Sequence, residues 1–169
     1  MALRPTWHIE PVRALQTHAL RQQVLRAHQD VAEVGFPGDD DPDAGHFAAF
    51  AFAGSGSGSG SASGSGIIGV VSVLRECPAT TTAPDPARWW RLRGMATAAP
   101  YRNQGVGSAL VAAVLAHVAA HHGTVLWCYA RLPAVGFYSG AGFAVTGDPW
   151  DEPALGPHVA MARAVPPPP

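Results

Sequence analysis

The chain has 169 residues, of which 47% are hydrophobic and 14% are charged, and its formal net charge is -1. This length and apolar content predict one globular domain with a buried core. The near-neutral charge argues against nucleic acid or an anionic membrane as a partner, and no apolar run reaches the roughly 18 residues of a membrane span. All 11 basic residues are arginines, which indicates a GC-rich, bacterial gene and excludes a lysine nucleophile.

Two cysteines, Cys77 and Cys128, limit the metal and redox chemistry of the chain. They are too few for a zinc site and their spacing matches no metal motif, so no bound metal is expected. The beginning of the chain has no hydrophobic signal region. We therefore expect a protein of the reducing cytoplasm.

The first half of the chain predicts a strand, a helix and two further strands. The first strand covers 6–12, and apolar residues near helical spacing predict a helix over 14–34. Residues 36–45 include four aspartates and several helix breakers, which is typical of a loop. Strands are then expected over 46–53 and 67–74.

A Gly/Ser-rich stretch, 54–66, separates those last two strands. Its composition predicts a flexible coil. A domain boundary would also fit, but neither flank has an obvious core of its own, so we expect an expanded hairpin loop. Such an insertion is tolerated because each doubling of loop length costs only about 0.6 kcal/mol.

The second half of the chain alternates strands with helices. A loop over 75–88 precedes a strand over 89–98, and a long helix over 104–122 ends at Gly123, which is a C-cap signal. The remaining expected elements are a strand over 124–130, a short helix over 133–140, strands over 143–146 and 158–163, and an exposed proline tail over 166–169. This order predicts an α/β fold with a mixed, partly antiparallel sheet.

The junction between the strand 89–98 and the long helix carries the pattern Arg102-x-x-Gly105-x-Gly107. A helix begins with unpaired N–H groups and the positive end of its dipole, and glycines let a phosphate approach those groups closely. Arg102 adds a cation with a fork of donors. The pattern predicts a phosphate-binding cradle over 102–109, although glycines used only for close packing would also explain it.

Two common nucleotide-binding motifs do not fit the cradle. A P-loop requires Gly-Lys-Ser or Gly-Lys-Thr, and the dinucleotide fingerprint requires Gly-x-Gly-x-x-Gly with an acidic residue about 20 positions later. The chain has neither arrangement.

Downstream of the cradle, Ala134, Tyr138 and Gly142-Phe143 follow in order. Together with the cradle, they make the stretch from about 91 to 163 resemble the Gcn5-related N-acetyltransferase (GNAT) superfamily. The order of elements from residue 6 onward fits the same family.

The run Cys128-x-Ala130-Arg131 and the ending Gly156-Pro157-His158-Val159-Ala160-Met161 are similar to one bacterial subgroup of acetyltransferases with poorly defined substrates. The resemblance implies a single domain over 1–165, with 54–66 as a flexible loop within it. It also implies the GNAT fold, in which a mostly antiparallel central sheet of six or seven strands splays between the fourth and fifth strands and is flanked by about four helices.

The resemblance further assigns residues to acetyl-CoA, the co-substrate. Its pantetheine part would lie in the splay and bond to the backbone of Met95, Ala96 and Thr97. The other residues implied in binding are Arg102, Asn103, Gln104, Gly105, Val106, Gly107, Ser108 and Ala109 at the diphosphate, with Arg131, Ala134 and Phe137. Arg131 stands where many members have asparagine, so it is expected either to contact a ligand or to be a structural cap or surface residue.

Tyr138 falls where many members of the family place a general acid. A phenol, whose ordinary pKa is about 10, can protonate the leaving thiolate, although a packed aromatic beside Phe137 is the alternative interpretation. The general base is not determined. The candidates are Glu76, Glu33, His46 and His158, of which Glu76 is favoured because it follows a central strand, although a solvated strand end would also explain it.

Two other reactive groups are expected to be structural. His117 and His121 lie one helical turn apart, but no third metal ligand is evident. Cys128 would need a base partner for covalent catalysis, and the family transfers the acetyl group directly, so it is interpreted as a core residue.

These features predict an acetyl-CoA-dependent N-acetyltransferase that acts on a primary amine of a small molecule or a protein. A non-catalytic acyl-CoA-binding or sensing module is the alternative. The acidic run Asp39 to Asp43 suggests a cationic acceptor such as a polyamine or an aminoglycoside. Because family members are often dimers, the resemblance allows a homodimer.

Overall fold

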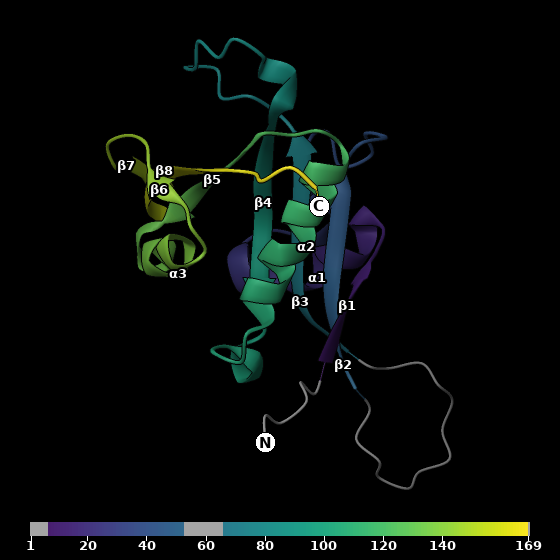
Figure 1. The fold of residues 1–169 in the computed structure, drawn as a ribbon. Coiled ribbons are helices and arrows are strands. Elements are labelled where there is room, and N and C mark those ends of the chain that lie inside the picture. Colours follow the sequence, from purple (N-terminus) through teal and green to yellow (C-terminus); the bar gives the residue numbers. More distant parts are fainter. Residues whose placement is uncertain (1–6, 53–65, 169) are drawn as a thin grey trace, which may run out of the picture.

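One sheet of eight strands organises the computed structural model, which describes residues 7–52 and 66–168 (Figure 1). The strands are β1 (Trp7–Pro11), β2 (Gly45–Ala51), β3 (Ile67–Arg75), β4 (Trp89–Thr97), β5 (Val125–Arg131), β6 (Ala144–Val145), β7 (Trp150–Glu152) and β8 (Gly156–Ala164). Their order is β1-β2-β3-β4-β5-β8-β6, with β7 paired to β8. Each pair is antiparallel except β4 and β5, which are parallel. This sheet confirms the predicted fold class.

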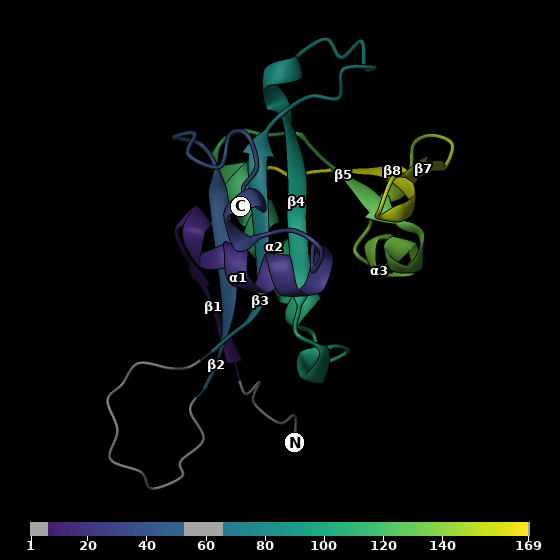
Figure 2. The same cartoon turned by 180° about the vertical axis from the view of Figure 1, so that it is seen from behind.

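Three α-helices and four short 3-10 helices complete the described part of the chain. They are α1 (Ala14–Leu25), α2 (Val106–Ala120), α3 (Val135–Gly140), η1 (Val31–Glu33), η2 (Pro86–Arg88), η3 (Ala99–Tyr101) and η4 (Leu132–Ala134). The two opposite views show α2 on one face of the sheet and α1 on the other (Figures 1 and 2). No helix in the described ranges has the length and apolar character needed to cross a membrane.

Two elements differ from the expected ones. The helix expected over 14–34 ends at Leu25, because Arg26 leaves the helical conformation with φ -139° and ψ 41°. The side chain of Gln22 then donates a hydrogen bond to the Gln29 carbonyl at 3.0 Å, which holds the turn that follows. The second element, β7, was not predicted. It forms in the Pro-rich loop, where Trp150 pairs with His158 of β8.

Most of the expected loop over 54–66 lies outside the described residues. The strands on its two sides, β2 and β3, are antiparallel neighbours. The insert therefore joins adjacent strands, as a hairpin loop does. Of the proline tail, 166–168 is exposed and belongs to no helix or strand, and Pro169 lies outside the described residues.

The packing of α2 against the sheet fixes the start of that helix. Val106, Leu110, Val114 and Val118 recur every four residues, and all of them are buried in the main core. Gly69 of β3 permits this close approach, since a Cβ there would lie 2.7 Å from Val106 Cγ1. Burying one such side chain contributes roughly 1.5–3 kcal/mol. The cradle at the start of α2 is therefore held firmly against the sheet.

The strands β4 and β5 pair only at one end. Their register runs from Trp89 opposite Val125 to Arg91 opposite Trp127, although both strands continue further. Beyond this point β4 bends at an irregularity in its pairing with β3, where Gly94 has φ +59°. The two strands therefore diverge, which confirms the predicted splay.

A buried polar cluster, made of Arg21, Asp39, His46 and Ser72, fastens α1 to the sheet. Arg21 Nη1 donates to the Val34 carbonyl at 2.9 Å and to Asp39 Oδ2 at 3.2 Å, and Nη2 donates to Ser72 Oγ at 2.6 Å. His46 Nε2 donates to the Asp39 carbonyl at 2.8 Å, while its Nδ1 lies 2.7 Å from Ser72 Oγ. We call this group the Arg21 cluster.

Candidate active site

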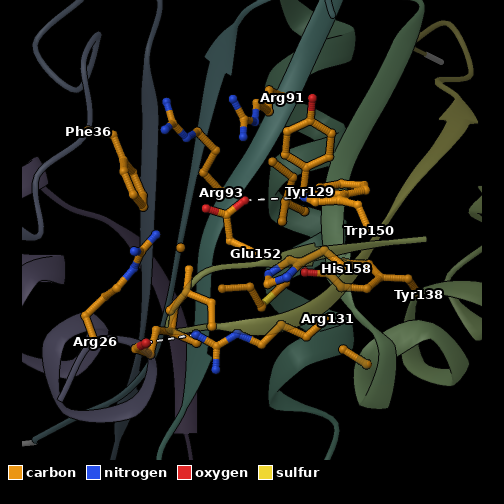
Figure 3. Close-up of a pocket in the computed structure, with 17 residues that line it drawn as sticks. Arg26, Phe36, Arg91, Arg93, Tyr129, Arg131, Tyr138, Trp150, Glu152 and His158 are labelled. Atoms are coloured by element: carbon orange, nitrogen blue, oxygen red, sulfur yellow. Dashed lines mark hydrogen bonds between the residues drawn. The ribbon is translucent and has the colours of Figure 1, made fainter. Parts of the chain in front are cut away.

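A cavity of about 340 Å³ lies where β4 and β5 diverge (Figure 3). It is bounded by the end of α1, the loop after it, both splayed strands, the start of α3 and the β7–β8 hairpin. Its lining residues are Leu25, Arg26, Phe36, Arg91, Leu92, Arg93, Gly94, Met95, Tyr129, Ala130, Arg131, Ala134, Tyr138, Trp150, Glu152, Leu155 and His158. The cavity thus joins residues from distant parts of the chain at the splay.

The charged residues of the cavity are mostly cationic. Arg26, Arg91, Arg93 and Arg131 line it, against one carboxylate, Glu152. Figure 3 shows these arginines coming from α1, β4 and β5 around a common space. The net charge of the cavity lining is therefore positive, opposite in sign to that of the acidic run Asp39 to Asp43.

The acidic run is occupied elsewhere in the fold. Asp39 belongs to the Arg21 cluster, and Asp43 forms an ion pair with Arg75 at 2.9 Å. Neither carboxylate lines the cavity. The geometry therefore gives no support to the suggestion that this run attracts a cationic acceptor.

Glu76, the favoured sequence candidate for the base, does not line the cavity. Its Oε1 accepts a hydrogen bond from Arg91 Nη1 at 2.7 Å, and its Oε2 lies 3.7 Å from Arg93 Nη1. Its backbone carbonyl also accepts from Trp127 Nε1 at 2.7 Å. The carboxylate thus lies behind the two arginines of β4 and orients them.

The arginines of β4 are held by aromatic rings. The Arg91 guanidinium carbon lies 4.8 Å from the ring centre of Trp127 and 4.6 Å from that of Tyr129. That of Arg93 lies 4.2 Å from the ring centre of Phe36. Burial, followed by repulsion from Arg91, lowers the pKa of Arg93, while Glu76 opposes the shift.

Tyr138 reaches the cavity from α3. The residue is only 6% exposed, and its ring packs edge-on against Phe137 and Phe143. Its hydroxyl end points toward His158 (Figure 3). Burial, with a smaller contribution from Cys128, raises the pKa of Tyr138 well above its ordinary value of 10.0, so the phenol stays protonated at neutral pH.

His158 is oriented by its own strand. Its Nδ1 lies 2.8 Å from the Gly156 carbonyl, which can only accept, so Nδ1 carries the proton and the Nε2 of the neutral ring keeps a lone pair. Trp150 stacks on the ring with centroids 5.9 Å apart. The Trp150 indole also donates to Glu152 Oε2 at 3.3 Å. The hairpin of β7 and β8 thus presents an imidazole and a carboxylate to the cavity.

Arg131 lies opposite His158 across the β5–β8 pair. Its Nη2 donates to the Leu25 carbonyl at 2.8 Å, which caps the end of α1. Burial, and then the like charge of Arg26, lowers the pKa of Arg131. Arg131 is therefore a helix cap that also lines the cavity, and its contact with a ligand stays a prediction.

The cradle lies outside this cavity, at the start of α2. Gly105 precedes the helix with φ +83°, and no side chain caps the helix start. A Cβ at Gly105 would have its nearest neighbour, Trp7 Cζ2, at 3.9 Å, so the space there is open. Arg102 Nε donates to the Thr97 carbonyl at 3.2 Å, which places that cation beside the end of β4. These features fit the diphosphate of acetyl-CoA.

The second cradle glycine has a different neighbour. A Cβ at Gly107 would lie 3.0 Å from the ring of Phe137, which is 37% exposed. The absence of a side chain at Gly107 therefore makes room for this ring between α2 and α3. Packing explains Gly107, whereas the turn and the open space explain Gly105.

The structure brings some of the expected site residues together and separates others. Met95, Arg131, Ala134, Tyr138 and His158 line the cavity, whereas Ala96 is buried against Leu20 and Val70. The remaining candidates lie away from it: Thr97 and the cradle at the end of β4 and the start of α2, His46 in the Arg21 cluster, Glu33 in η1, and His117 against the Asp43 carbonyl. No group of metal ligands was found among the described residues.

Several cavity residues were not singled out from the sequence. They are Arg26, Phe36, Arg91, Arg93, Tyr129, Trp150 and Glu152. The alternation Arg91-x-Arg93 in a central strand was the one available signal, since a charged pair on one face of such a strand needs a partner. Nothing local marks Arg26, Phe36 or Glu152.

A sheet splayed between two parallel strands, with a glycine-rich helix start beside it, defines the class of protein predicted from the sequence, an acyltransferase that uses acetyl-CoA. The chain belongs to the GNAT acetyltransferase family, whose domain model matches residues 61–145. The uncharacterized N-acetyltransferase YitI of Bacillus subtilis (strain 168) is 26% identical over 157 residues, which are 93% of this chain and 95% of YitI.

Solved structures share the fold. An aminoglycoside 6'-N-acetyltransferase complexed with coenzyme A matches with a TM-score of 0.66 and 14% identity, over 96% of this chain and 99% of that one. Escherichia coli ElaA matches with a TM-score of 0.66 and 16% identity, over 93% of this chain and 99% of that one. The predicted family and fold are thus confirmed.

Proposed function

We propose that the protein transfers the acetyl group of acetyl-CoA directly to a primary amine at the splay, with Tyr138 as general acid. The observation that carries this proposal is the meeting of three features: the divergence of β4 and β5, the open helix start at Gly105, and a protonated phenol in the cavity between them. The cradle 102–109 binds the diphosphate, and the backbone of Met95, Ala96 and Thr97 binds the pantetheine.

The reaction needs a proton removed at one end and supplied at the other. The amine nitrogen attacks the thioester carbonyl, the C–S bond breaks, and the CoA thiolate takes the proton of Tyr138. His158 Nε2 accepts the proton that the acceptor's ammonium loses before it attacks as a free amine, and the second proton that the nitrogen loses as the amide forms restores the Tyr138 phenol. In this proposal Glu76 acts by orienting Arg91 and Arg93, not as the base.

Two measurements test the proposal together. Calorimetry with acetyl-CoA should give a one-to-one binding isotherm, and an assay for free CoA thiol across a panel of amines should give amine-dependent release. Binding without release for any amine would favour the non-catalytic acyl-CoA module. If acetyl-CoA neither binds nor releases its thiol, close packing would be the remaining explanation of Gly105 and Gly107.

The base assignment has its own test. His158→Gln should lower kcat at neutral pH by about 100-fold, and the loss should shrink at high pH, where the free amine needs no base. Glu76→Gln should affect KM more than kcat, since that carboxylate contacts arginines rather than reacting atoms. Equal kcat for His158→Gln and wild type would remove the imidazole from the mechanism.

We also propose a cytoplasmic location and leave a homodimer as a hypothesis. The location is supported by the thiols, because Cys77 and Cys128 are both free. Sedimentation at micromolar concentration tests the dimer.

A further inference from the structure

The arginines of the cavity carry more positive charge than the fold neutralises. No ion pair of the described residues includes Arg26 or Arg131, and Arg91 and Arg93 share a single carboxylate, that of Glu76. Arg91 Nε is buried without a hydrogen-bond partner. Grouped, partly buried guanidinium groups are unfavourable unless an anion joins them.

These arginines lie on the α1 side of the sheet. Trp90 and Leu92 of β4 are buried in the core beneath α2, so the alternating Arg91 and Arg93 project to the opposite face. Arg26 ends α1 on that same face. The cradle, in contrast, belongs to the start of α2.

The acetyl donor does not require this charge. Its diphosphate is assigned to the cradle, its 3′-phosphate lies on the nucleoside beyond that diphosphate, and the pantetheine and acetyl groups that reach the splay carry no charge. An anion in the cavity must therefore belong to the other substrate.

We infer that the acceptor is a small amine that also carries a carboxylate or a phosphate group, and that Arg26, Arg91 and Arg93 bind that anionic group. This inference rests on the proposed acetyl transfer and names its substrate class. Guanidinium forks suit both anions, because each offers a pair of oxygens for parallel hydrogen bonds. The cavity volume of about 340 Å³ suits a small molecule.

The rest of the cavity is complementary to such an acceptor. Tyr129, Trp150 and Phe36 supply aromatic surface for its carbon skeleton. His158 and Glu152 point into the same space (Figure 3) and can receive the ammonium end. The cavity therefore offers partners for both ends of an acceptor that carries opposite charges.

Matched amine pairs test the inference. With acetyl-CoA as donor, thiol release is compared for L-phenylalanine and L-phenylalaninamide, for 2-aminoethyl phosphate and ethanolamine, and for spermidine as a cationic amine. We expect the anionic member of at least one pair to have a kcat/KM at least about tenfold higher. The pair in which the anionic member is preferred shows whether the acceptor's anionic group is a carboxylate or a phosphate. The phenylalanine pair is stringent, because the amide has the less basic and intrinsically more available amine.

Arginine variants locate the effect. Arg26→Gln and Arg93→Gln should each lower kcat/KM for the preferred anionic amine by about tenfold while changing that of the neutral partner by less than about twofold. Arg88→Gln is the matched control, since Arg88 is exposed and donates to the His122 carbonyl outside the cavity. Affinity for acetyl-CoA should stay the same in all three variants.

The outcomes separate this inference from the proposed function. If neither pair favours its anionic member, or if spermidine has the highest kcat/KM of the five amines, the anionic acceptor is overturned and the acetyltransferase is left intact. If acetyl-CoA binds but no amine reacts, calorimetry of the CoA-loaded protein with N-acetylphenylalanine and its amide decides. Tighter binding of the carboxylate supports the inference, and equal or absent binding overturns it. A protein that does not bind acetyl-CoA at all would overturn both.

Discussion

Two arginines stack on the same ring, Phe36, and have opposite surroundings. The guanidinium carbon of Arg21 lies 4.1 Å from the ring centre and that of Arg93 lies 4.2 Å from it. Arg21 donates to three acceptors supplied by the chain, Val34, Asp39 and Ser72. Among the described residues, the carboxylate paired with Arg93 is the distant one of Glu76, which Arg91 shares. Both Nη atoms of Arg21 have partners in the chain, although its Nε has none, so Arg21 stabilises the fold. Arg93, with its weaker pairing, is available to a ligand.

The largest expected effect is on stability and concerns Arg21. Arg21→Met should lower the free energy of unfolding by about 3–5 kcal/mol, because it leaves Asp39 charged and buried without its partner. Urea denaturation measures the loss. Arg26→Met, at the residue that follows the same helix, is the control and should change stability by less than about 1 kcal/mol. Equal losses of unfolding free energy in the two variants would mean that the Arg21 cluster stabilises the fold no more than the cavity arginine does.

Tyr138→Phe should lose activity and keep its stability, whereas Arg21→Met should lose stability. Loss of the general acid should lower kcat by about 100-fold with an accepted amine, while the buried ring keeps its packing and the unfolding free energy changes by less than about 1 kcal/mol. Thiol release at saturating substrates measures kcat. Tyr129→Phe, a cavity tyrosine with an exposed ring, is the matched control. Unchanged turnover in Tyr138→Phe would make this residue purely structural.

The pH profile sharpens the same point. A general acid acts only while protonated, so its contribution is lost as the pH rises through its pKa. Burial raises the pKa of Tyr138 above 10.0. We therefore expect no alkaline decline in kcat between pH 7 and about 10 from this group. A decline near pH 8 that disappears in Tyr138→Phe would contradict the burial.

Cys128 should have a smaller effect, on stability alone. Burial raises the pKa of its thiol to about 12, with Arg91 opposing the shift, so no thiolate forms at neutral pH. Cys128→Ala should cost about 1 kcal/mol and leave kcat within about threefold. In the native wild-type protein, iodoacetamide should modify the partly exposed Cys77 and spare Cys128. A kcat loss as large as that of Tyr138→Phe would point to covalent catalysis.

The smallest expected effect concerns His117, a second group satisfied by the chain. Its Nε2 donates to the Asp43 carbonyl, with His121 and Trp90 beside it. Burial lowers the pKa of His117 below 6.5, with His121 and the more distant His46 adding to this and Asp43 opposing it. The unfolded chain then binds the proton first, so this contribution to stability is complete above pH 6.5 and falls as the pH drops.

Urea unfolding at several pH values tests this sign. His117→Gln should show a flatter dependence of unfolding free energy on pH between 5 and 7 than the wild type. A steeper dependence in the variant would mean that the native state holds the proton more tightly.

Local patterns predicted the elements around the cradle better than those around the cavity. The cradle and the C-cap signal Gly123 each depend on contiguous residues, so the strand, turn and helix around them could be predicted. The end of α1 could not, because Val31 continues the apolar spacing into what is the separate helix η1. Nor could β7, a three-residue strand whose pairing partner lies beyond a Pro-rich turn.

The cavity depends on long-range contacts. Glu76 looked like a base because it follows a central strand, but the antiparallel register of β3 and β4 brings the arginines of β4 to it. His46, another candidate for the base, lies instead in the Arg21 cluster. Such partners are set by register and by packing across the sheet, which no local pattern encodes.

The early end of β4–β5 pairing leaves two strand edges open inside the sheet. Amides on these edges should exchange with deuterium quickly in the free protein, while those of Trp89 to Arg91, which are paired with β5, should exchange slowly. Acetyl-CoA would fill the gap and slow the exchange. At 100 times its dissociation constant, it would add about 2.7 kcal/mol to folding stability. The stability of the folded enzyme would then rise and fall with the concentration of acetyl-CoA.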